Sequence, residues 1–459
     1  MRIRFHLPFR SVAAAAVLAG LMLFPGLASS QPTLDQATVP KASPIEEPAT
    51  IEVSGPWTVV VNYKGQKEKF VISRPDLVMV ISEKYNSIPV FNPSGPSWRQ
   101  GIPFTGVNAS ECSVEGALVP GSVSIFLKEG GEPLTEGTDY ILNESSGNIG
   151  RTENGKIGPN TTIYASYKYY KQRIDSIVDS GGRMALVRGK PHAVNPEPPV
   201  LKDGATRLAN IYIPGKIDAI GEDNLFPILD SGEYIPPEKR EAAKSLLTKT
   251  WNKLVNGEYV KIIAWGDSVT ECGFIPDDQR WQVQFVTWLR ERFPRAEIEL
   301  VTEAWGGRNT DSYFGEPAGS PHNFKEKVLD AKPDLVISEF VNDGGFNKEK
   351  VEQNYGRIRD ELAKIGAEWI ILTPHYIRPN WMGLSVQKDI DQDPRAYTTA
   401  IREFCAENNI ACADGAALYG RLWREGVPYL TLMVNNINHP NGKGMKIFAD
   451  ALRALFEAP

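Results

Sequence analysis

The chain is poor in the residues that build metal sites and disulfide frameworks. Its 459 residues include only four cysteines and five histidines. The spacing of the cysteines matches no zinc-binding pattern. Cys405 and Cys412 either pair between a helix end and the next strand or remain two buried thiols, since an exported chain permits disulfides. No cluster of histidines and carboxylates points to a metal, so we expect an activity that needs neither a metal nor another cofactor.

Excess positive charge and long apolar runs are also missing. The formal net charge is −6 at pH 7, with no basic run, which argues against a nucleic-acid partner. The apolar stretch at 11–24 is too short to span a bilayer comfortably. It follows Arg2, Arg4 and Arg10 and precedes small residues at 28–30, which is typical of a secretory signal. We therefore predict that residues 1–30 are a signal peptide, and that the mature protein is secreted or periplasmic and has no membrane span.

Beyond the predicted signal, the composition changes twice along the chain. Residues 31–50 contain four prolines and little apolar periodicity, and we interpret them as a linker. Residues 51–215 hold short β-branched or aromatic runs separated by Gly, Pro, Asn and Asp. This pattern predicts an all-β, sandwich-like domain, or two small β modules in tandem with a break near 118–121.

Residues 216–459 alternate between helical and strand patterns. Strands are predicted at 260–265, 297–302, 334–340, 369–373 and 410–413. Helices are predicted at 237–255, 281–293, 323–331, 348–365, 396–408 and 443–456. This alternation is typical of an α/β fold, a parallel sheet with helices on both faces, and five strands suggest a flavodoxin-like order.

Four loops at the predicted strand ends carry side chains suited to acyl transfer. Ser268 follows the first strand in Gly-Asp-Ser, and a Gly-Gly pair, Gly306 and Gly307, follows the second. Asn342 follows the third, and His439 precedes the last helix. A serine hydrolase needs a nucleophile, a base and donors for the oxyanion. Because the carboxyl ends of parallel strands form one rim, we expect these groups to converge there.

These blocks resemble the SGNH (GDSL-type) hydrolase superfamily, whose blocks are Gly-Asp-Ser, a glycine, Asn-Asp and a terminal Asp-x-x-His. The resemblance covers about residues 250–440. It implies the SGNH hydrolase fold, Ser268 as nucleophile and His439 as base. It also implies an oxyanion hole formed by the backbone N–H groups of Ser268 and Gly307 and the side chain of Asn342. Gly307 fits the family spacing better than Gly306.

The sequence departs from this pattern at Asn436, which stands where the superfamily has aspartate, three residues before His439. The aspartate normally fixes the tautomer of the imidazole and stabilises its positive charge. We favour a Ser-His dyad in which Asn436 or a backbone carbonyl orients His439. The alternatives are a carboxylate from elsewhere, such as Glu339 or Asp414, and an inactive site.

Three further residues are candidates for substrate binding. Trp305 and Arg308 flank the oxyanion glycine, and His375 follows the fourth strand. His375 is equally compatible with an ordinary loop position. The long polar loop 376–394 is expected to cover the site.

Together these features predict a carboxylic ester hydrolase that removes O-acyl groups, chiefly O-acetyl groups, from polysaccharide or oligosaccharide. The carbohydrate expectation rests on the export signal, the β region and similarity to carbohydrate esterases that join a β-sandwich to an SGNH domain. The rival functions are a lipase or thioesterase of the same superfamily, and a polysaccharide-binding surface protein with an inactive hydrolase domain. No oligomeric state follows from the sequence.

Overall fold

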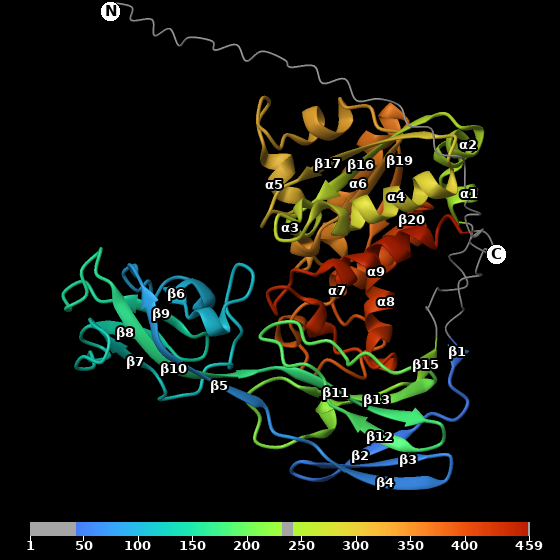
Figure 1. Cartoon of the computed structure of the whole chain (residues 1–459). Helices are drawn as coiled ribbons and strands as arrows, with labels where there is room; N and C mark the ends of the chain where they lie inside the picture. The colour runs from blue at the N-terminus through green and yellow to red at the C-terminus, as the bar shows by residue number, and fades with distance from the viewer. Residues whose placement is uncertain (1–42, 232–241, 458–459) are drawn as a thin grey trace, which may run out of the picture. The chain divides into compact units, whose positions relative to one another are not determined.

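The structure is a computed structural model that describes residues 43–231 and 242–457 (Figure 1). The predicted signal peptide and most of the predicted linker lie outside these ranges. No helix in the described part of the chain combines the length and the apolar character that crossing a membrane would require.

The C-terminal part contains the predicted five-stranded parallel sheet. Its strand order is β17-β16-β18-β19-β20, so the first strand in sequence lies between the second and third, as in flavodoxin-like folds. The strands are β16 (Tyr259–Gly266), β17 (Glu297–Ala304), β18 (Leu335–Glu339), β19 (Glu368–Leu372) and β20 (Ala411–Ala413). The α/β prediction and the strand order are confirmed.

Helices cover both faces of this sheet (Figure 1). Alternate residues of β16 pack on opposite faces of the sheet, because successive side chains of a strand point in opposite directions. Ile262 and Ala264 belong to a core with α2, α4 and α9, and Ile263 and Trp265 to a core with α6 and α7. The helices are α1 (Ala242–Leu246), α2 (Thr248–Asn256), α3 (Ser268–Glu271), α4 (Trp281–Arg292), α5 (Thr310–Gly315), α6 (Lys348–Ile365), α7 (Ala396–Asn408), α8 (Gly415–Arg421) and α9 (Gly442–Arg453).

Two helix predictions differ from the structure in detail. The helix predicted at 237–255 is divided into α1 and α2, because Leu247 leaves the helical conformation with φ −125° and ψ 46°. Residues 237–241 lie outside the described ranges. Around the predicted helix 323–331, the chain forms a π-helical turn at Lys325–Leu329, whose Val328 and Leu329 reach the core.

The N-terminal part has the expected antiparallel β character, but its sheets form two cores. One core, called outer because its strands come before and after the other unit in sequence, joins the sheets β2-β3-β4 and β12-β11-β13-β14. The other core, called inner, joins β5-β10-β7 and β6-β9-β8. The longer strands are β2 (Thr50–Gly55), β3 (Thr58–Tyr63), β4 (Gln66–Val71), β5 (Asp76–Tyr85), β8 (Tyr140–Asn143), β9 (Asn148–Arg151), β10 (Ile163–Lys171), β11 (Arg173–Ser180), β12 (Met184–Val187) and β13 (Ala205–Ile213). The shorter ones are β1 (Ser43–Pro44), β6 (Ile102–Pro103), β7 (Ser124–Phe126), β14 (Leu225–Pro227) and β15 (Asp230–Ser231).

The two β units are nested and do not follow one another in tandem. The inner unit begins with β5 and ends with β10, and these strands pair along their length, which brings its two ends together. The outer unit uses strands from before and after this insertion. The position proposed for a break, 118–121, lies inside the inner unit, where Leu118 is buried and bridges to Tyr169.

Candidate active site

Ser268 stands at the carboxyl end of β16, at the first position of the short helix α3. Asp267 caps this helix: its Oδ1 accepts the N–H of Val269 at 3.0 Å, and its Oδ2 accepts the N–H of Asn342 at 2.8 Å. One carboxylate therefore ties the nucleophile turn to the loop after β18. The N–H of Ser268 belongs to the first turn, where helical N–H groups lack acceptors within the helix. It is thus suited to stabilise an oxyanion.

Gly266 precedes this turn at a point where no side chain fits. A Cβ at this position would lie 2.2 Å from Thr270 Oγ1 and 2.3 Å from the backbone oxygen of Glu339. The neighbouring strand therefore approaches β16 closely because residue 266 is glycine.

Gly266→Ala is expected to lower the free energy of unfolding by about 1–3 kcal/mol, the usual cost of overpacking. Urea unfolding followed by circular dichroism would measure this. Gly273→Ala is the matched control, because a Cβ there meets nothing within 4 Å. Equal stabilities of the two variants would contradict the close approach.

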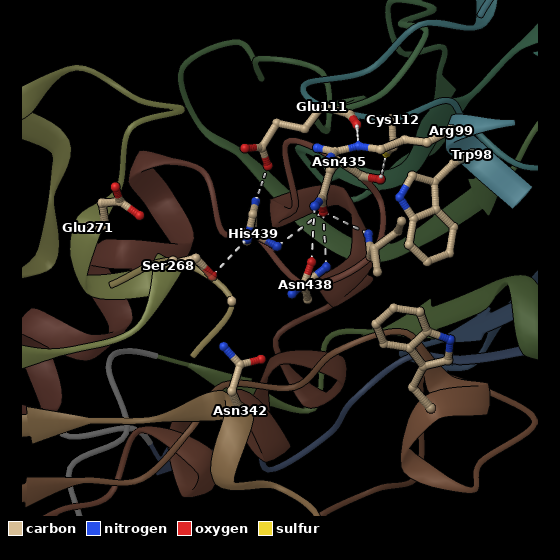
Figure 2. Close-up of a pocket in the computed structure, with 14 residues that line it drawn as sticks. Trp98, Arg99, Glu111, Cys112, Ser268, Glu271, Asn342, Asn435, Asn438 and His439 are labelled. Atoms are coloured by element: carbon tan, nitrogen blue, oxygen red, sulfur yellow. Dashed lines mark hydrogen bonds and ion pairs between the residues drawn. The ribbon is translucent and has the colours of Figure 1, made fainter. Parts of the chain in front are cut away.

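The catalytic base expected from the sequence faces the serine. His439 Nε2 lies 3.0 Å from Ser268 Oγ (Figure 2). The ring of Phe274 stacks on the imidazole, with centroids 4.3 Å apart. Asn435 shapes the loop, because its Oδ1 accepts the N–H groups of Ile437, Asn438 and His439 at 2.9–3.1 Å. The position of the imidazole is therefore set by both stacking and a side-chain-capped turn.

A carboxylate outside the four sequence blocks contacts the other imidazole nitrogen. Glu111 Oε2 is hydrogen-bonded to His439 Nδ1 (Figure 2). Glu111 belongs to the inner β unit, in the loop between η2 (Thr105–Val107) and β7. The two residues are 328 positions apart in the chain. No local motif marks Glu111, so sequence spacing could not have identified it.

The structure does not bring Asn436 to the imidazole. Asn436 has a left-handed backbone, with φ 55°, and its side chain faces residues of the β region. There its Nδ2 donates to the carbonyl of Val194 at 3.1 Å, and its Oδ1 accepts from Gln172 at 2.9 Å. Asn436 therefore anchors the loop that carries His439.

The two carboxylates considered as alternatives also lie elsewhere. Glu339 is buried and accepts from Thr270 at 3.3 Å. Asp414 caps α8 and forms an ion pair with Arg402. Each has a structural partner of its own, so neither supplies the carboxylate at His439.

The oxyanion donors expected from the sequence surround the same opening. Gly306, Gly307 and Asn342 line one cleft with Ser268 and His439. Gly307 has φ 73°, a left-handed conformation that favours glycine. One hydrogen of Asn342 Nδ2 is directed to the carbonyl of Arg308 at 3.2 Å, which leaves the other for a ligand. Donors arranged in this way beside a serine hydroxyl are suited to hold an oxyanion.

Buried carboxyls lie beneath this hole. Burial raises the pKa of both Asp267 and Asp343 to about 7, and burial together with the nearby Asp267 raises the pKa of Glu339 well above its ordinary value. Asp343 is held by Thr310 and by the hydroxyl of Tyr355. These carboxyls therefore keep their protons at a higher pH than ordinary aspartates and glutamates do.

The base itself stays neutral under ordinary conditions. Burial lowers the pKa of His439, and the charge of Glu111 opposes that shift. A neutral imidazole can accept a proton from Ser268, whereas a protonated one cannot.

The three substrate-contact candidates lie outside the lining of the cleft. Trp305 stacks on His322 with centroids 4.5 Å apart, and the guanidinium of Arg308 lies over Trp305. His375 is buried, and its Nε2 donates to the backbone oxygen of Asn438 at 2.7 Å. Burial lowers the pKa of His375 to about 3, so it remains neutral. His375 therefore supports the loop that carries His439.

Other residues form the wall of the cleft, whose volume is about 360 Å³. Trp98 and Arg99 come from the short helix η1 (Ser97–Arg99) of the β region. Trp381 comes from η8 (Pro379–Met382), inside the loop expected to cover the site. The sequence offered no signal for Trp98 and Arg99, because the β region had no predicted role in the site.

Comparisons with known proteins point to one enzyme family. Residues 264–447 match the model of the GDSL-like Lipase/Acylhydrolase family. No curated protein matched the chain.

Several solved structures align with part of the chain. One is a two-domain esterase active on acetylated mannans, with 18% identity and a TM-score of 0.37 over 46% of this chain and 53% of that protein. Another is an acetyl xylan esterase, with 21% identity and a TM-score of 0.35 over 42% of this chain and 98% of that one. A third is a variant of an acetyl xylan esterase from Geobacillus stearothermophilus, with 19% identity and a TM-score of 0.33 over 44% and 96%. The alignment spans about half the length of the first of these structures.

Proposed function

Because residues 264–447 form a domain of the GDSL-like lipase/acylhydrolase family, we propose that the protein is a serine esterase that removes O-acyl groups, chiefly O-acetyl groups, from carbohydrate. The observation that carries this proposal is the 3.0 Å contact between Ser268 Oγ and His439 Nε2 beside an oxyanion hole. The export predicted from residues 1–30 would bring the enzyme to polysaccharide outside the cytoplasm.

The geometry supports a two-step acyl transfer. His439 takes the proton of Ser268 as the serine oxygen attacks the ester carbonyl. The N–H groups of Ser268 and Gly307 and the amide of Asn342 hold the oxyanion. His439 then protonates the departing sugar oxygen, which leaves an acyl group on Ser268. A water molecule, activated by the same imidazole, releases the acid and restores the serine.

The lining of the cleft favours sugars over long acyl chains. Charged and amide groups, including Arg99, Glu271 and Asn438, share the wall with two tryptophans. The rings of Trp98 and Trp381 have centroids 5.8 Å apart, and Trp381 is 45% exposed. Exposed indole faces stack against the C–H faces of sugar rings, while the polar groups suit sugar hydroxyls. A lipase would present a broad apolar channel for the acyl chain.

The substrate class is tested with the wild-type protein on four esters. Acetate release from acetylated xylan and acetylated mannan would be measured by proton NMR, alongside hydrolysis of an aryl acetate and an aryl palmitate. We expect acetate from at least one polymer and no hydrolysis of the palmitate. Hydrolysis of the palmitate without release from either polymer would favour a lipase. A protein that hydrolyses no ester would contradict the esterase proposal and favour a binding function.

Trp381→Ala is expected to separate polymer binding from chemistry. The kcat/KM for the acetylated polymer should fall roughly 3- to 10-fold, since an aromatic contact contributes about 0.5–1.5 kcal/mol. The rate on the small aryl acetate should change less than about 2-fold, because Ser268 and His439 do not touch this ring. Equal losses on both substrates would show that Trp381 supports the fold and not the substrate.

A further inference from the structure

We propose that Glu111, supplied by the N-terminal β region, is the positioning carboxylate of the catalytic histidine. The hydrolase domain would then hold the nucleophile, the base and the oxyanion hole, and the β region would complete the site. This inference rests on the proposed esterase function of the same site.

The imidazole bridges two oxygen atoms in a way that defines its tautomer. His439 Nε2 faces Ser268 Oγ, and Nδ1 faces the carboxylate of Glu111. To accept the serine proton, Nε2 must be unprotonated, so the hydrogen of the neutral ring must be on Nδ1. The carboxylate of Glu111 accepts that hydrogen. It also stabilises the positive imidazole that forms when the serine attacks.

The other carboxylate in the cleft does not compete for this role. Glu271 belongs to α3 and extends towards Gly306, where a Cβ would lie 2.4 Å from its Oε2. Figure 2 shows Glu271 apart from the imidazole and Glu111 directed at it. Among the described residues, Glu111 is thus the carboxylate positioned to orient the base.

The backbone of Glu111 is held in an unusual conformation. Its φ is 66°, in the left-handed region that residues other than Gly, Asn and Asp rarely adopt. Arg99 Nε donates to the backbone oxygen of Glu111 at 3.3 Å, and Ala109 N–H donates to the backbone oxygen of Cys112 at 2.8 Å. Such conformations persist where the surrounding structure enforces them, and they cluster at functional sites.

The residues on either side of Glu111 are hydrogen-bonded to the loop that carries His439. The N–H of Ser110 donates to the carbonyl of Val434 at 3.2 Å. The thiol of Cys112 donates to the carbonyl of Asn435 at 3.0 Å, and burial raises the pKa of this thiol to about 12, so it keeps its hydrogen. Asn435 in turn caps the turn that ends at His439. Contacts on both sides of Glu111 therefore fix the carboxylate relative to the imidazole.

The charges around His439 determine in which direction its pKa should move when Glu111 is replaced. Three charged groups act on His439: Glu111 and Glu271 raise its pKa, and Arg99 lowers it. The neighbouring imidazole of His375 is buried and stays neutral. Removing the charge of Glu111 therefore lowers the pKa of His439 further. The acidic limb of the pH profile of kcat/KM should move to lower pH.

The test compares Glu111→Gln and Glu111→Ala with Glu115→Gln. Glu115 lies on the same loop and pairs with Arg378 of the hydrolase domain at 2.6 Å, without contacting His439. For an aryl acetate we expect Glu111→Gln to lower kcat roughly 10²- to 10⁴-fold, by analogy with the loss of a triad aspartate. KM should change little, and the acidic limb should shift to lower pH. Glu115→Gln should stay within about 3-fold of the wild type.

A spectroscopic signal tests the contact without reference to activity. Nδ1–H of His439, hydrogen-bonded to a carboxylate, should give a far-downfield proton resonance in protein labelled with ¹⁵N-histidine. We expect the resonance in the wild type and in Glu115→Gln, and its loss in Glu111→Gln and Glu111→Ala. Thermal unfolding would verify that all variants fold.

The outcomes separate this inference from the esterase proposal. A wild-type rate and pH profile in Glu111→Gln would overturn the role of Glu111 and leave the esterase function intact. Equal losses in the Glu111 and Glu115 variants, with unmoved pH profiles, would also overturn it, since they would show only that the loop must dock. A wild type that hydrolyses no ester but shows the resonance would contradict the esterase and support the Glu111 contact.

Discussion

Ser268→Ala is expected to abolish ester hydrolysis almost completely. Loss of the nucleophile of a serine hydrolase lowers kcat on the order of 10⁶-fold, because the acyl-enzyme can no longer form. The residual rate would come from the oxyanion hole acting on a water molecule. The hydrolysis of an aryl acetate, followed continuously by absorbance, measures the loss over the required range.

Ser110→Ala is the matched control for this substitution. Ser110 lies in the loop that carries Glu111, and its contact with the hydrolase domain uses the backbone N–H, which alanine retains. Its activity should therefore remain close to that of the wild type. Substantial hydrolysis by a folded Ser268→Ala protein would contradict the assignment of the nucleophile.

His439→Ala should reduce kcat by a similar factor, on the order of 10⁴- to 10⁶-fold. Without the imidazole, the hydroxyl of Ser268 keeps its proton at neutral pH and is a weak nucleophile. Stopped assays with an aryl acetate would measure the rate, and added imidazole should restore part of it through the vacated space. His322→Ala is the control, because His322 pairs with Glu303 and stacks on Trp305 outside the cleft.

The pH profile of the wild type gives a second measure of the same base. The ordinary pKa of histidine is about 6.5, and burial lowers that of His439. Because the neutral form is the active one, kcat/KM should stay high below pH 6.5 and fall only when His439 becomes protonated. A profile that already falls above pH 7 on its acidic side would contradict this assignment, as would a folded His439→Ala protein of wild-type activity.

The losses of activity caused by Ser268→Ala and His439→Ala should not be additive in the double variant. In the proposed mechanism Ser268 and His439 act as one unit, so the double variant should be about as active as either single variant. This behaviour follows from the hydrogen bond that joins them.

The hydrolase fold was accessible from the sequence because its strands are buried on both faces. Runs such as 260–265 contain almost only apolar residues, and the helices between them have a distinct 3.6-residue period. Right-handed βαβ connections determine which face of the sheet each helix covers, and the presence of five such strands suggested the flavodoxin-like order. The same logic predicted that Ser268, Gly307, Asn342 and His439 meet at one rim, and the structure places all four on one cleft.

The β region was predicted less well, for a physical reason. Alternation of apolar and polar residues identifies strands but does not say which strands pair. The nested arrangement results from the pairing of β5 with β10, which are separated by nearly eighty residues. No local sequence pattern indicates this pairing. Glu111 could not be predicted for the same reason. Its partner, His439, is 328 positions away in the chain, and only the tertiary structure brings the two together.

Asn436 illustrates a different limit. Its position relative to His439 suggested a role in orienting the ring, but a left-handed backbone turns its side chain towards Gln172 and Val194. Sequence spacing fixes which residues are neighbours along the chain and not where their side chains point. His375 is similar: it is buried, and its hydrogen bond to the backbone oxygen of Asn438 supports the loop that carries His439.

Covalent trapping tests most directly whether Ser268 is a nucleophile activated by His439. The wild-type protein would be treated with a serine-directed fluorophosphonate and digested, and the modified peptide would be mapped by mass spectrometry. We expect one adduct, on Ser268, formed in step with the loss of hydrolysis and far more slowly in His439→Ala. An adduct on another residue that accompanies the loss of activity, or an unmodified Ser268 in a fully inhibited protein, would contradict it.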